Sequence, residues 1–502
     1  RVVDFMVKNP VSDPTIPGAL FRKPGWFGQM KLYLRRDIDT KRTNKQYLSL
    51  VLFEAPLLAL ILSFFMKYAP DGHYTFSGND NIPSFLFMSM VIALFVGMSL
   101  SAEEIFRDRR ILKREQFLHL SRGAYFSSKI LLMFLLSAFQ MLAYVAVSYL
   151  ILDIRGLTFS TWAILFSTAC FANVLGLNLS SGLNSIVSIY VAIPLILVPQ
   201  LLFSGLIVDF TKMHASMNSY RSTPIVADIM ASRWSYEALA VDRFMNNRYQ
   251  KQVFQLEQEK NDVSFKTFYW IPEVQKNIDM HRRSLSEGKI QEANERIPLI
   301  ENAFQTLDTW LATSDDSLSM AIHQLAVAPF NPENVESYDR CLDQSNDRFF
   351  ARYEQINSEL DRKYLSLTRS LGGSPQLQRF RNRYTNRKLE DLVRDTHAYS
   401  RLKVIDNQIV QADESIYRMP QKRNGQAHFY APCKYLGSLK IGTPLFNILV
   451  MWIFTFFLIV SLYFDLLRKA LAYVERWRLI RQAILREKIF DNPMAFIKGE
   501  KK

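Results

Sequence analysis

The most densely charged segment of the chain lies between two long apolar stretches, at residues 103–115. It begins with two carboxylates, Glu103 and Glu104. Within about three helical turns there follow the other charged residues of interest, namely Arg109, Arg110, Lys113, Arg114 and Glu115. A cytoplasmic loop beside a membrane is expected to be basic. That rule does not account for Glu103 and Glu104, because a charge near a membrane boundary is costly, so these carboxylates indicate a function beyond membrane topology.

Sequence motifs for catalysis are absent from the chain. It contains no G-x-x-x-x-G-K-[ST] phosphate loop, no H-E-x-x-H or C-x-x-C, and no G-x-S-x-G. The seven histidines are scattered, and His119 and His214 lack the paired spacing of metal ligands. We therefore predict no catalytic residue, no metal site and no cofactor bound by this chain.

The apolar residues are pooled into long runs, although 22% of the residues are charged and the mean hydropathy is −0.02. Each run is about 20 residues long, which is the length needed to cross a hydrocarbon core of about 30 Å. A soluble core would distribute these residues at helical or strand spacing instead. Because backbone groups in lipid must be satisfied internally, we predict membrane helices at 46–66, 84–105, 127–152, 161–181, 186–208 and 443–464. Pro56, Pro194 and Pro199 should kink them.

Basic residues predict the orientation of these helices. They gather before the first helix (Lys31, Arg35, Arg36, Lys41, Arg42, Lys45), between the second and third (Arg107, Arg109, Arg110, Lys113, Arg114, Arg122) and after the sixth (Arg468, Lys469, Arg476, Arg478, Arg481, Arg486). The loops at 67–83 and 153–160 hold only Lys67 and Arg155. The positive-inside rule therefore places both termini and the 106–126 loop in the cytoplasm, and residues 209–442 outside.

The predicted fold is an all-α membrane protein with six transmembrane helices and a large helical extracytoplasmic insertion between helices 5 and 6. The predicted segments are a linker at 1–25, a basic amphipathic helix at 26–45, transmembrane helices 1–5 at 46–208, a re-entrant segment at 209–245, a helical external domain at 246–436, transmembrane helix 6 at 437–468 and a basic cytoplasmic tail at 469–502. An amphipathic helix such as 26–45 is suited to the headgroup region.

The insertion is expected to form a helical hairpin or a small bundle. Apolar residues recur near helical spacing within 290–311, 349–371 and 389–409, and no strand alternation is convincing. Gly372, Gly373 and Pro375 separate the second stretch from the third. Cys341 and Cys433 would either pair outside the cytoplasm or remain free thiols, and the sequence does not fix the distance between them.

Two segments resemble the membrane half of ABC exporters of the G subfamily, the white/multidrug-exporter type. The first has the pattern Glu104, Arg109, Arg110, Glu115, Tyr125, Phe126 and Lys129. In that family this turn is the coupling helix that rests on the nucleotide-binding domain. The resemblance implies that Glu104, Arg109, Arg110, Arg114 and Glu115 pass ATP-driven closure into the membrane helices.

The second match lies at the exit of the fifth helix, where Phe203, Ser204 and Gly205 precede the apolar pair Leu206 and Ile207. In the family such a pair is a plug between two cavities, whereas without the resemblance it is simply a packed helix end. Residues 232–239 are similar to the re-entrant segment that follows.

The resemblance covers 26–245 and 440–470, and it does not extend to 246–436. It also fails at Gly97, near which some relatives place a cavity aromatic, and Phe95 and Met98 are the nearest replacements. Glu54 in the first helix must face protein, water or a partner, so it either contacts cargo or pairs with a neighbouring helix.

The resemblance implies an ABC-2 type permease, the membrane half of an ATP-driven exporter of amphipathic or lipid-like cargo. ATP and Mg would bind on a nucleotide-binding domain that precedes Arg1 or belongs to the same complex. The other expected partners are a second copy of the membrane half, membrane lipids and a periplasmic protein, with no nucleic acid. The large insertion suggests the bacterial inner membrane. Two alternatives stay open: a mechanotransmitter that acts on a periplasmic partner, and a non-ABC membrane scaffold or receptor.

Overall fold

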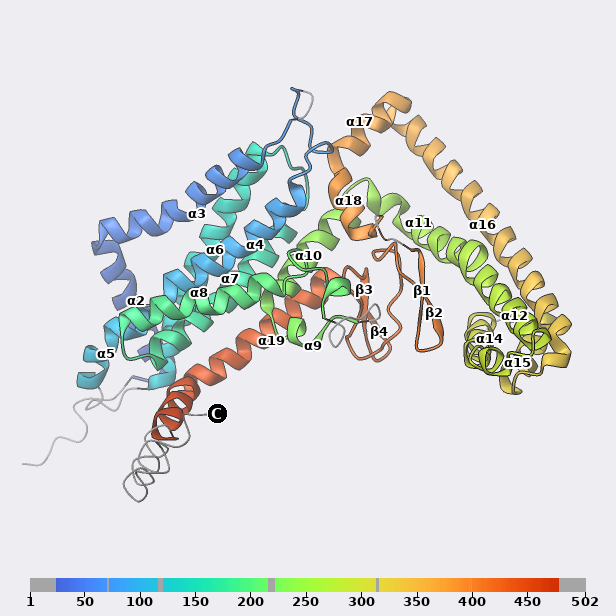
Figure 1. Cartoon of the computed structure of the whole chain (residues 1–502). Helices are drawn as coiled ribbons and strands as arrows, with labels where there is room; N and C mark the ends of the chain where they lie inside the picture. The colour runs from blue at the N-terminus through green and yellow to red at the C-terminus, as the bar shows by residue number, and fades with distance from the viewer. Residues whose placement is uncertain are drawn as a thin grey trace, which may run out of the picture.

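The structure is a computed structural model that describes residues 24–69, 72–115, 121–214, 222–312, 316–396, 398 and 400–477. Most of the predicted linker at 1–25 and of the predicted tail at 469–502 lies outside these residues. The described chain forms a bundle of apolar helices, from one end of which a second, largely helical part projects (Figure 1).

The bundle contains α3 (Lys45–Met66), α4 (Ile82–Ser101), α6 (Arg122–Ile151), α7 (Thr158–Gly182), α8 (Ile186–Leu202) and α19 (Thr443–Tyr463). Among the described helices, all of these except α8 are long and apolar enough to cross a membrane. The predicted fifth span, 186–208, is only partly helical. It ends at Leu202 after 17 residues, about 25 Å of helix, and Gly205 takes a left-handed φ of +90°.

The centre of the bundle is the close packing of α4 against α7. A Cβ on Gly97 would lie 2.6 Å from the carbonyl oxygen of Ala169 and 2.8 Å from the Cβ of Ala172. Only glycine lets the two backbones approach this closely. Gly97 therefore faces a neighbouring helix, where a larger side chain does not fit. The outer helices expose apolar side chains, such as Phe53 on α3 and Phe456 on α19.

Different elements cap the two ends of the bundle (Figure 1). At one end lie α2 (Trp26–Thr43), α5 (Glu104–Glu115) and the last turns of α19. At the other end lie α9 (Ile225–Asp228) and α10 (Ala231–Met245). Every residue of α10 from Ala231 to Phe244 is buried, because the helix packs against α4, α7 and α19.

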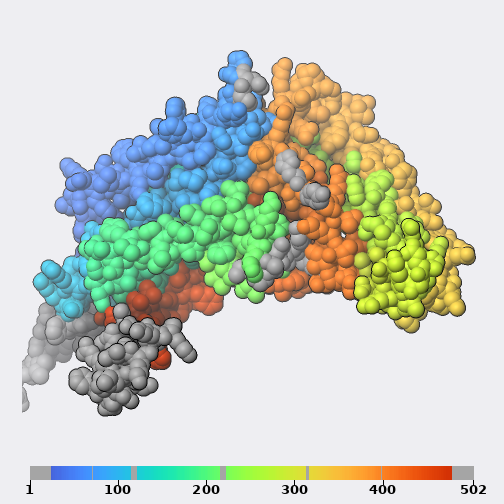
Figure 2. Space-filling view, in the orientation of Figure 1, coloured from blue at the N-terminus to red at the C-terminus, as the bar shows by residue number. Residues whose placement is uncertain are grey.

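The projecting part consists of α11 (Gln250–Phe265), a π-helical turn (Lys266–Trp270), α12 (Ile271–Ser286), α13 (Ile290–Asn294), α14 (Ile297–Leu311), α15 (Ser317–Val327), α16 (Val335–Leu371), α17 (Ser374–Tyr384) and α18 (Arg387–Arg394). The helices α11 and α16 pack along each other as an arm, and α12–α15 close a separate core at its tip around Trp270, Phe304 and Leu342. Figure 2 shows the arm and tip extending beyond the bundle. The helices predicted within 290–311 and 349–371 are present.

The described chain is predominantly helical, as predicted, and two short segments form β-hairpins instead. The strands β1 (Leu402–Ile405) and β2 (Gln408–Gln411) form one antiparallel hairpin, and β3 (Cys433–Leu436) and β4 (Leu439–Gly442) form another. The helix predicted across 389–409 ends at Arg394. Asp406 and Asn407 both have positive φ, as two-residue hairpin turns require. Four-residue strands are too short to show a clear alternation, which is why the sequence did not reveal them.

A buried ion network as the candidate functional site

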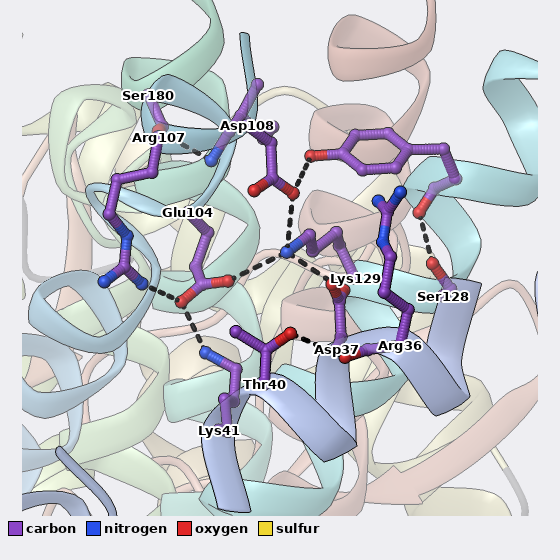
Figure 3. Close-up of polar contacts among 12 residues, drawn as sticks. Arg36, Asp37, Thr40, Lys41, Glu104, Arg107, Asp108, Ser128, Lys129 and Ser180 are labelled. Atoms are coloured by element: carbon purple, nitrogen blue, oxygen red, sulfur yellow. Dashed lines mark hydrogen bonds and ion pairs between the residues drawn. The ribbon is translucent and has the colours of Figure 1, made fainter. Parts of the chain in front are cut away.

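A cluster of six charged side chains joins three helices at the α2–α5 end of the bundle (Figure 3). We call it the Glu104 network, and its members are Asp37 and Lys41 on α2, Glu104, Arg107 and Asp108 on α5, and Lys129 on α6. It contains three carboxylates and three cations, so its formal charges balance. Balance of this kind makes the burial of charge tolerable.

Lys129 is the centre of the network. Its ammonium nitrogen lies 2.9 Å from Asp37 Oδ2, 3.1 Å from Glu104 Oε2 and 2.9 Å from Asp108 Oδ2. The side chain is only 4% exposed. One cation on α6 therefore holds a carboxylate from α2 and two from α5.

Glu104 completes the connection to α2. Its Oε1 accepts from Lys41 Nζ at 2.5 Å and from Arg107 Nη2 at 2.9 Å. Glu104 occupies the first turn of α5, where the exposed N–H groups favour a negative charge. The carboxylate is 3% exposed and is therefore compensated on both oxygens by cations from α2, α5 and α6.

Further hydrogen bonds attach α5 to α6 and α7. Tyr125 donates its hydroxyl to Asp108 Oδ2 at 3.0 Å. Ser180 Oγ accepts the backbone N–H groups of Ile105 and Phe106 at 3.1 and 3.0 Å, which satisfies donors that a helix N-terminus otherwise leaves free.

Arg109 contacts the C-terminal end of α7. Its Nη2 donates to the carbonyl oxygens of Ser180, Ser181 and Leu183 at 3.0, 2.8 and 2.5 Å. A cation at this position satisfies the last carbonyls of a helix and interacts favourably with its dipole. A displacement of α5 is thus coupled by polar contacts to α2, α6 and α7.

The electrostatics of the two α2 residues reflect their burial. Burial raises the pKa of the Asp37 carboxyl, and Lys129 opposes this shift. Burial also lowers the pKa of Lys41, against the opposing effect of Glu104. Both shifts have the sign that burial alone produces, so the ion pairs do not fully replace the lost water.

The structure brings together only some of the predicted coupling residues. Glu104 is buried and Arg109 is partly buried, whereas Arg110 and Arg114 are exposed on α5. The side chain of Glu115 lies outside the described residues. No group of three or more His, Cys, Asp or Glu that could hold a metal occurs in the described part of the chain.

Sequence reasoning missed Asp37, Lys41 and Asp108 as members of the Glu104 network. A signal was present on α2, since Tyr33, Asp37 and Lys41 are spaced four residues apart and share one helical face. The sequence interpretation treated this helix only as basic and amphipathic. It therefore did not single out Asp37, the buried carboxylate of α2.

The predicted valve and cavity residues do not form one site within this chain. Leu206 packs against the bundle core and lines a cavity of about 330 Å³ with Phe210, Phe429 and Tyr430. Ile207 is 53% exposed.

The other predicted cavity residues lie on two helices, α3 and α4. Phe95 is exposed on α4, and Met98 is buried on the same helix. Glu54 is partly buried on α3.

A second buried network lies at the opposite end of the bundle. We call it the Glu237 network, and its members are Arg233 and Glu237 on α10, Lys434 on β3 and Asn447 on α19. Lys434 Nζ donates to Glu237 Oε2 at 2.6 Å and to Asn447 Oδ1 at 2.8 Å. Arg233 Nη1 lies 3.7 Å from Glu237 Oε2. Burial and the nearby Arg233 lower the pKa of Lys434 to about 7.

The three cysteines are free and buried. Cys341 belongs to the tip core on α16, while Cys433 lies in β3. The two therefore sit in different parts of the structure, and no disulfide joins them.

Residues 28–239 match the family model of the ABC-2 type transporter. The matched segment starts in α2 and ends inside α10, so it contains α5, the Glu104 network and the bundle helices α3–α8. A search of curated proteins gave no match. The match and the apolar helices indicate an integral membrane protein in which residues 28–239 resemble the permease domain of ABC transporters. Permeases of this family generally work with an ATP-binding partner and pair with a second membrane subunit.

Proposed function

We propose that the chain is the permease half of an ATP-driven exporter of the G-subfamily type, which moves amphipathic or lipid-like cargo out of the cytoplasm or the inner leaflet. ATP and Mg bind on a nucleotide-binding domain that contacts α5, and a second copy of the membrane half completes the cargo path. The end of the bundle with α2 and α5 faces the cytoplasm. The observation that carries this proposal is the attachment of α5 to α2, α6 and α7 through the Glu104 network and Arg109.

The network gives α5 a direct mechanical connection to the membrane helices. Lys129 contacts carboxylates on α2 and α5 at the same time, so a displaced α5 draws both neighbours with it. Arg109 adds the end of α7. Because α7 packs against α4 and α19, the displacement reaches the centre of the bundle.

Cargo would leave near the end of α8. Leu206 and Ile207 follow the last turn of this helix, and the cavity beside Leu206 combines aromatic walls with charged residues such as Lys388 and Arg418. An amphipathic molecule can place its apolar part against such aromatic walls and its polar part among the charges. This combination supports amphipathic cargo.

The test uses the full chain reconstituted with its ATP-binding partner in liposomes. Glu104→Ala and Arg109→Ala should each retain ATP hydrolysis and lose most export of a fluorescent amphiphile. Glu103→Ala is the matched control, because Glu103 is the adjacent carboxylate but accepts from Tyr190 on α8 at 2.6 Å. Full export by both variants would refute the proposed coupling route.

The arm favours a second candidate, a mechanotransmitter in which ATP hydrolysis moves the projecting part against a periplasmic partner. Helix α16 has 37 residues, about 55 Å of helix, and the tip has its own core. Replacing 268–348 by a short glycine-rich linker would remove the tip and leave the packing of α11 on α16 in place. Retained export by this variant would exclude the mechanotransmitter. A receptor or scaffold outside the ABC class is disfavoured by the ABC-2 match.

A further inference from the structure

A cavity of about 370 Å³ lies beside the Glu104 network, between α2, α5, α6, the end of α7 and the segment that follows α19. Its charged lining consists of Arg109, Lys113, Arg122, Arg468 and Asp465. Four cations face one carboxylate, which leaves an excess of three positive charges. A cavity of this composition attracts an anion.

The single carboxylate is already engaged. Asp465 lies 3.2 Å from Arg122 Nη1 and accepts the hydroxyl of Ser181 at 3.2 Å. Arg109 donates to the carbonyls at the end of α7. Lys113 and Arg468 are exposed, and neither forms an ion pair with another described residue. These two side chains are therefore free to bind an anionic ligand.

The remaining wall of the cavity is apolar and aromatic. Tyr33 on α2, Leu112 on α5 and Phe126 on α6 line it. A small soluble anion needs no such wall, whereas an amphiphile can lay its apolar part along it. The lining thus combines a cationic centre with an apolar side.

Aromatic residues near the cavity indicate its depth in the membrane. Trp26 and Tyr463 approach each other at Gly123, where an added Cβ would lie 3.4 and 3.3 Å from them. Both are exposed, as is Phe464. Exposed tryptophan and tyrosine rings gather at the headgroup level of membranes. The cavity is therefore at the height of lipid phosphates.

We propose that this cavity binds the phosphate headgroup of an anionic phospholipid from the leaflet on the α2–α5 side. Lys113 and Arg468 contact the phosphate, and the acyl chains run along the apolar surface beside Phe126. Basic pockets between membrane helices bind lipid headgroups by this chemistry. Tyr125 also lines the cavity and donates to Asp108, so a bound lipid steadies the α5–α6 contact of the Glu104 network.

The proposal is tested on the purified full chain in detergent, with added phosphatidylglycerol, phosphatidylcholine or inorganic phosphate. Retained lipid is measured by native mass spectrometry and thermal stability by the unfolding temperature. We expect phosphatidylglycerol to bind and to raise the unfolding temperature, and the other two additives to do neither. Lys113→Gln combined with Arg468→Gln should weaken phosphatidylglycerol binding about tenfold.

The matched control is Arg110→Gln combined with Arg114→Gln, which removes two exposed cations of the same region that do not line the cavity. This variant should bind phosphatidylglycerol as the wild type does. The single variants Lys113→Gln and Arg468→Gln, with smaller losses in the same direction, carry the test if the double variant does not fold.

Three outcomes would overturn the proposal. Equal binding by the wild type and the double variant would place the lipid elsewhere. Stabilisation by inorganic phosphate alone would indicate a site for a free anion. Stabilisation only on addition of the ATP-binding partner would indicate that an acidic protein segment occupies the cavity.

Discussion

Buried ion networks lie at both ends of the helix bundle, and they differ in how far water reaches their side chains. The Glu104 network joins residues of three separate helices, and Arg107 keeps a side-chain exposure of 48%. The Glu237 network also joins three elements, α10, β3 and α19, but its charged members Arg233, Glu237 and Lys434 are at most 1% exposed.

The difference extends to the surrounding side chains. Trp234 stacks on both cations of the Glu237 network, with Arg233 Cζ 3.9 Å and Lys434 Nζ 4.4 Å from its ring centre. Such cation–π contacts are strongest where water is excluded. The Glu237 network therefore acts as a fixed anchor of α10 on α19, whereas the Glu104 network connects a partly hydrated, exposed helix to the bundle and can transmit a force applied to α5.

Glu237→Ala should have the largest effect on stability. It leaves Arg233 and Lys434 buried without their shared carboxylate, and breaking a buried ion pair in this way costs about 3–5 kcal/mol. The unfolding temperature of the purified chain in detergent at pH 7 measures the loss. Asp228→Ala is the control, because Asp228 also pairs with Arg233, at 3.5 Å, but is 21% exposed. Equal losses in the two variants would contradict the anchor role of Glu237.

Glu104→Gln should destabilise the chain less than Glu237→Ala does. Lys129 keeps Asp37 and Asp108 as partners, and the glutamine carbonyl can still accept hydrogen bonds from Lys41 and Arg107 in place of the carboxylate. We expect a loss of about 1–3 kcal/mol, measured by the same unfolding assay. A loss as large as that of Glu237→Ala would remove the distinction between the two networks.

The Glu237 network should also make stability depend on pH. The folded chain releases the Lys434 proton near pH 7, whereas the ordinary lysine pKa is 10.5. Between these values the unfolded chain binds more protons, so stability rises with pH, by at most about 1.4 kcal/mol per pH unit. Unfolding temperatures at pH 7 and pH 9 measure this rise, and Lys434→Met should abolish it. If the wild type instead lost stability between pH 7 and pH 9 relative to Lys434→Met, the predicted sign of the pH dependence would be wrong.

Much of the membrane part could be predicted from the sequence, because hydrophobic length alone determines where a helix can cross lipid. Glu104 was singled out as a charge at the end of an apolar run, and Arg109 through the family resemblance. Their partners depend on how helices pack, and Lys41 is 63 positions away from Glu104. The helix α8 ends at Leu202, earlier than predicted, and the left-handed conformation of Gly205 follows it. Composition alone does not reveal this conformation.

The projecting part was harder to predict. The amphipathic spacing of α14 and α16 was sufficient for helices, while the hairpin at Leu402–Gln411 was assigned to a helix because its apolar residues also fit helical spacing. Lys434 and Asn447 gave no signal at all, since each becomes meaningful only when β3 and α19 meet α10.

Labelling of Ile207 tests most directly whether the Glu104 network transmits movement of α5 to the far end of the bundle. Ile207 is exposed beyond α8, and the three native cysteines are buried, so Ile207→Cys offers one accessible thiol among the described residues. In liposomes with the ATP-binding partner, ATP should change the rate at which a polar maleimide modifies this thiol, and Glu104→Ala should abolish the change. An equal response to ATP with and without Glu104→Ala would contradict transmission through the network.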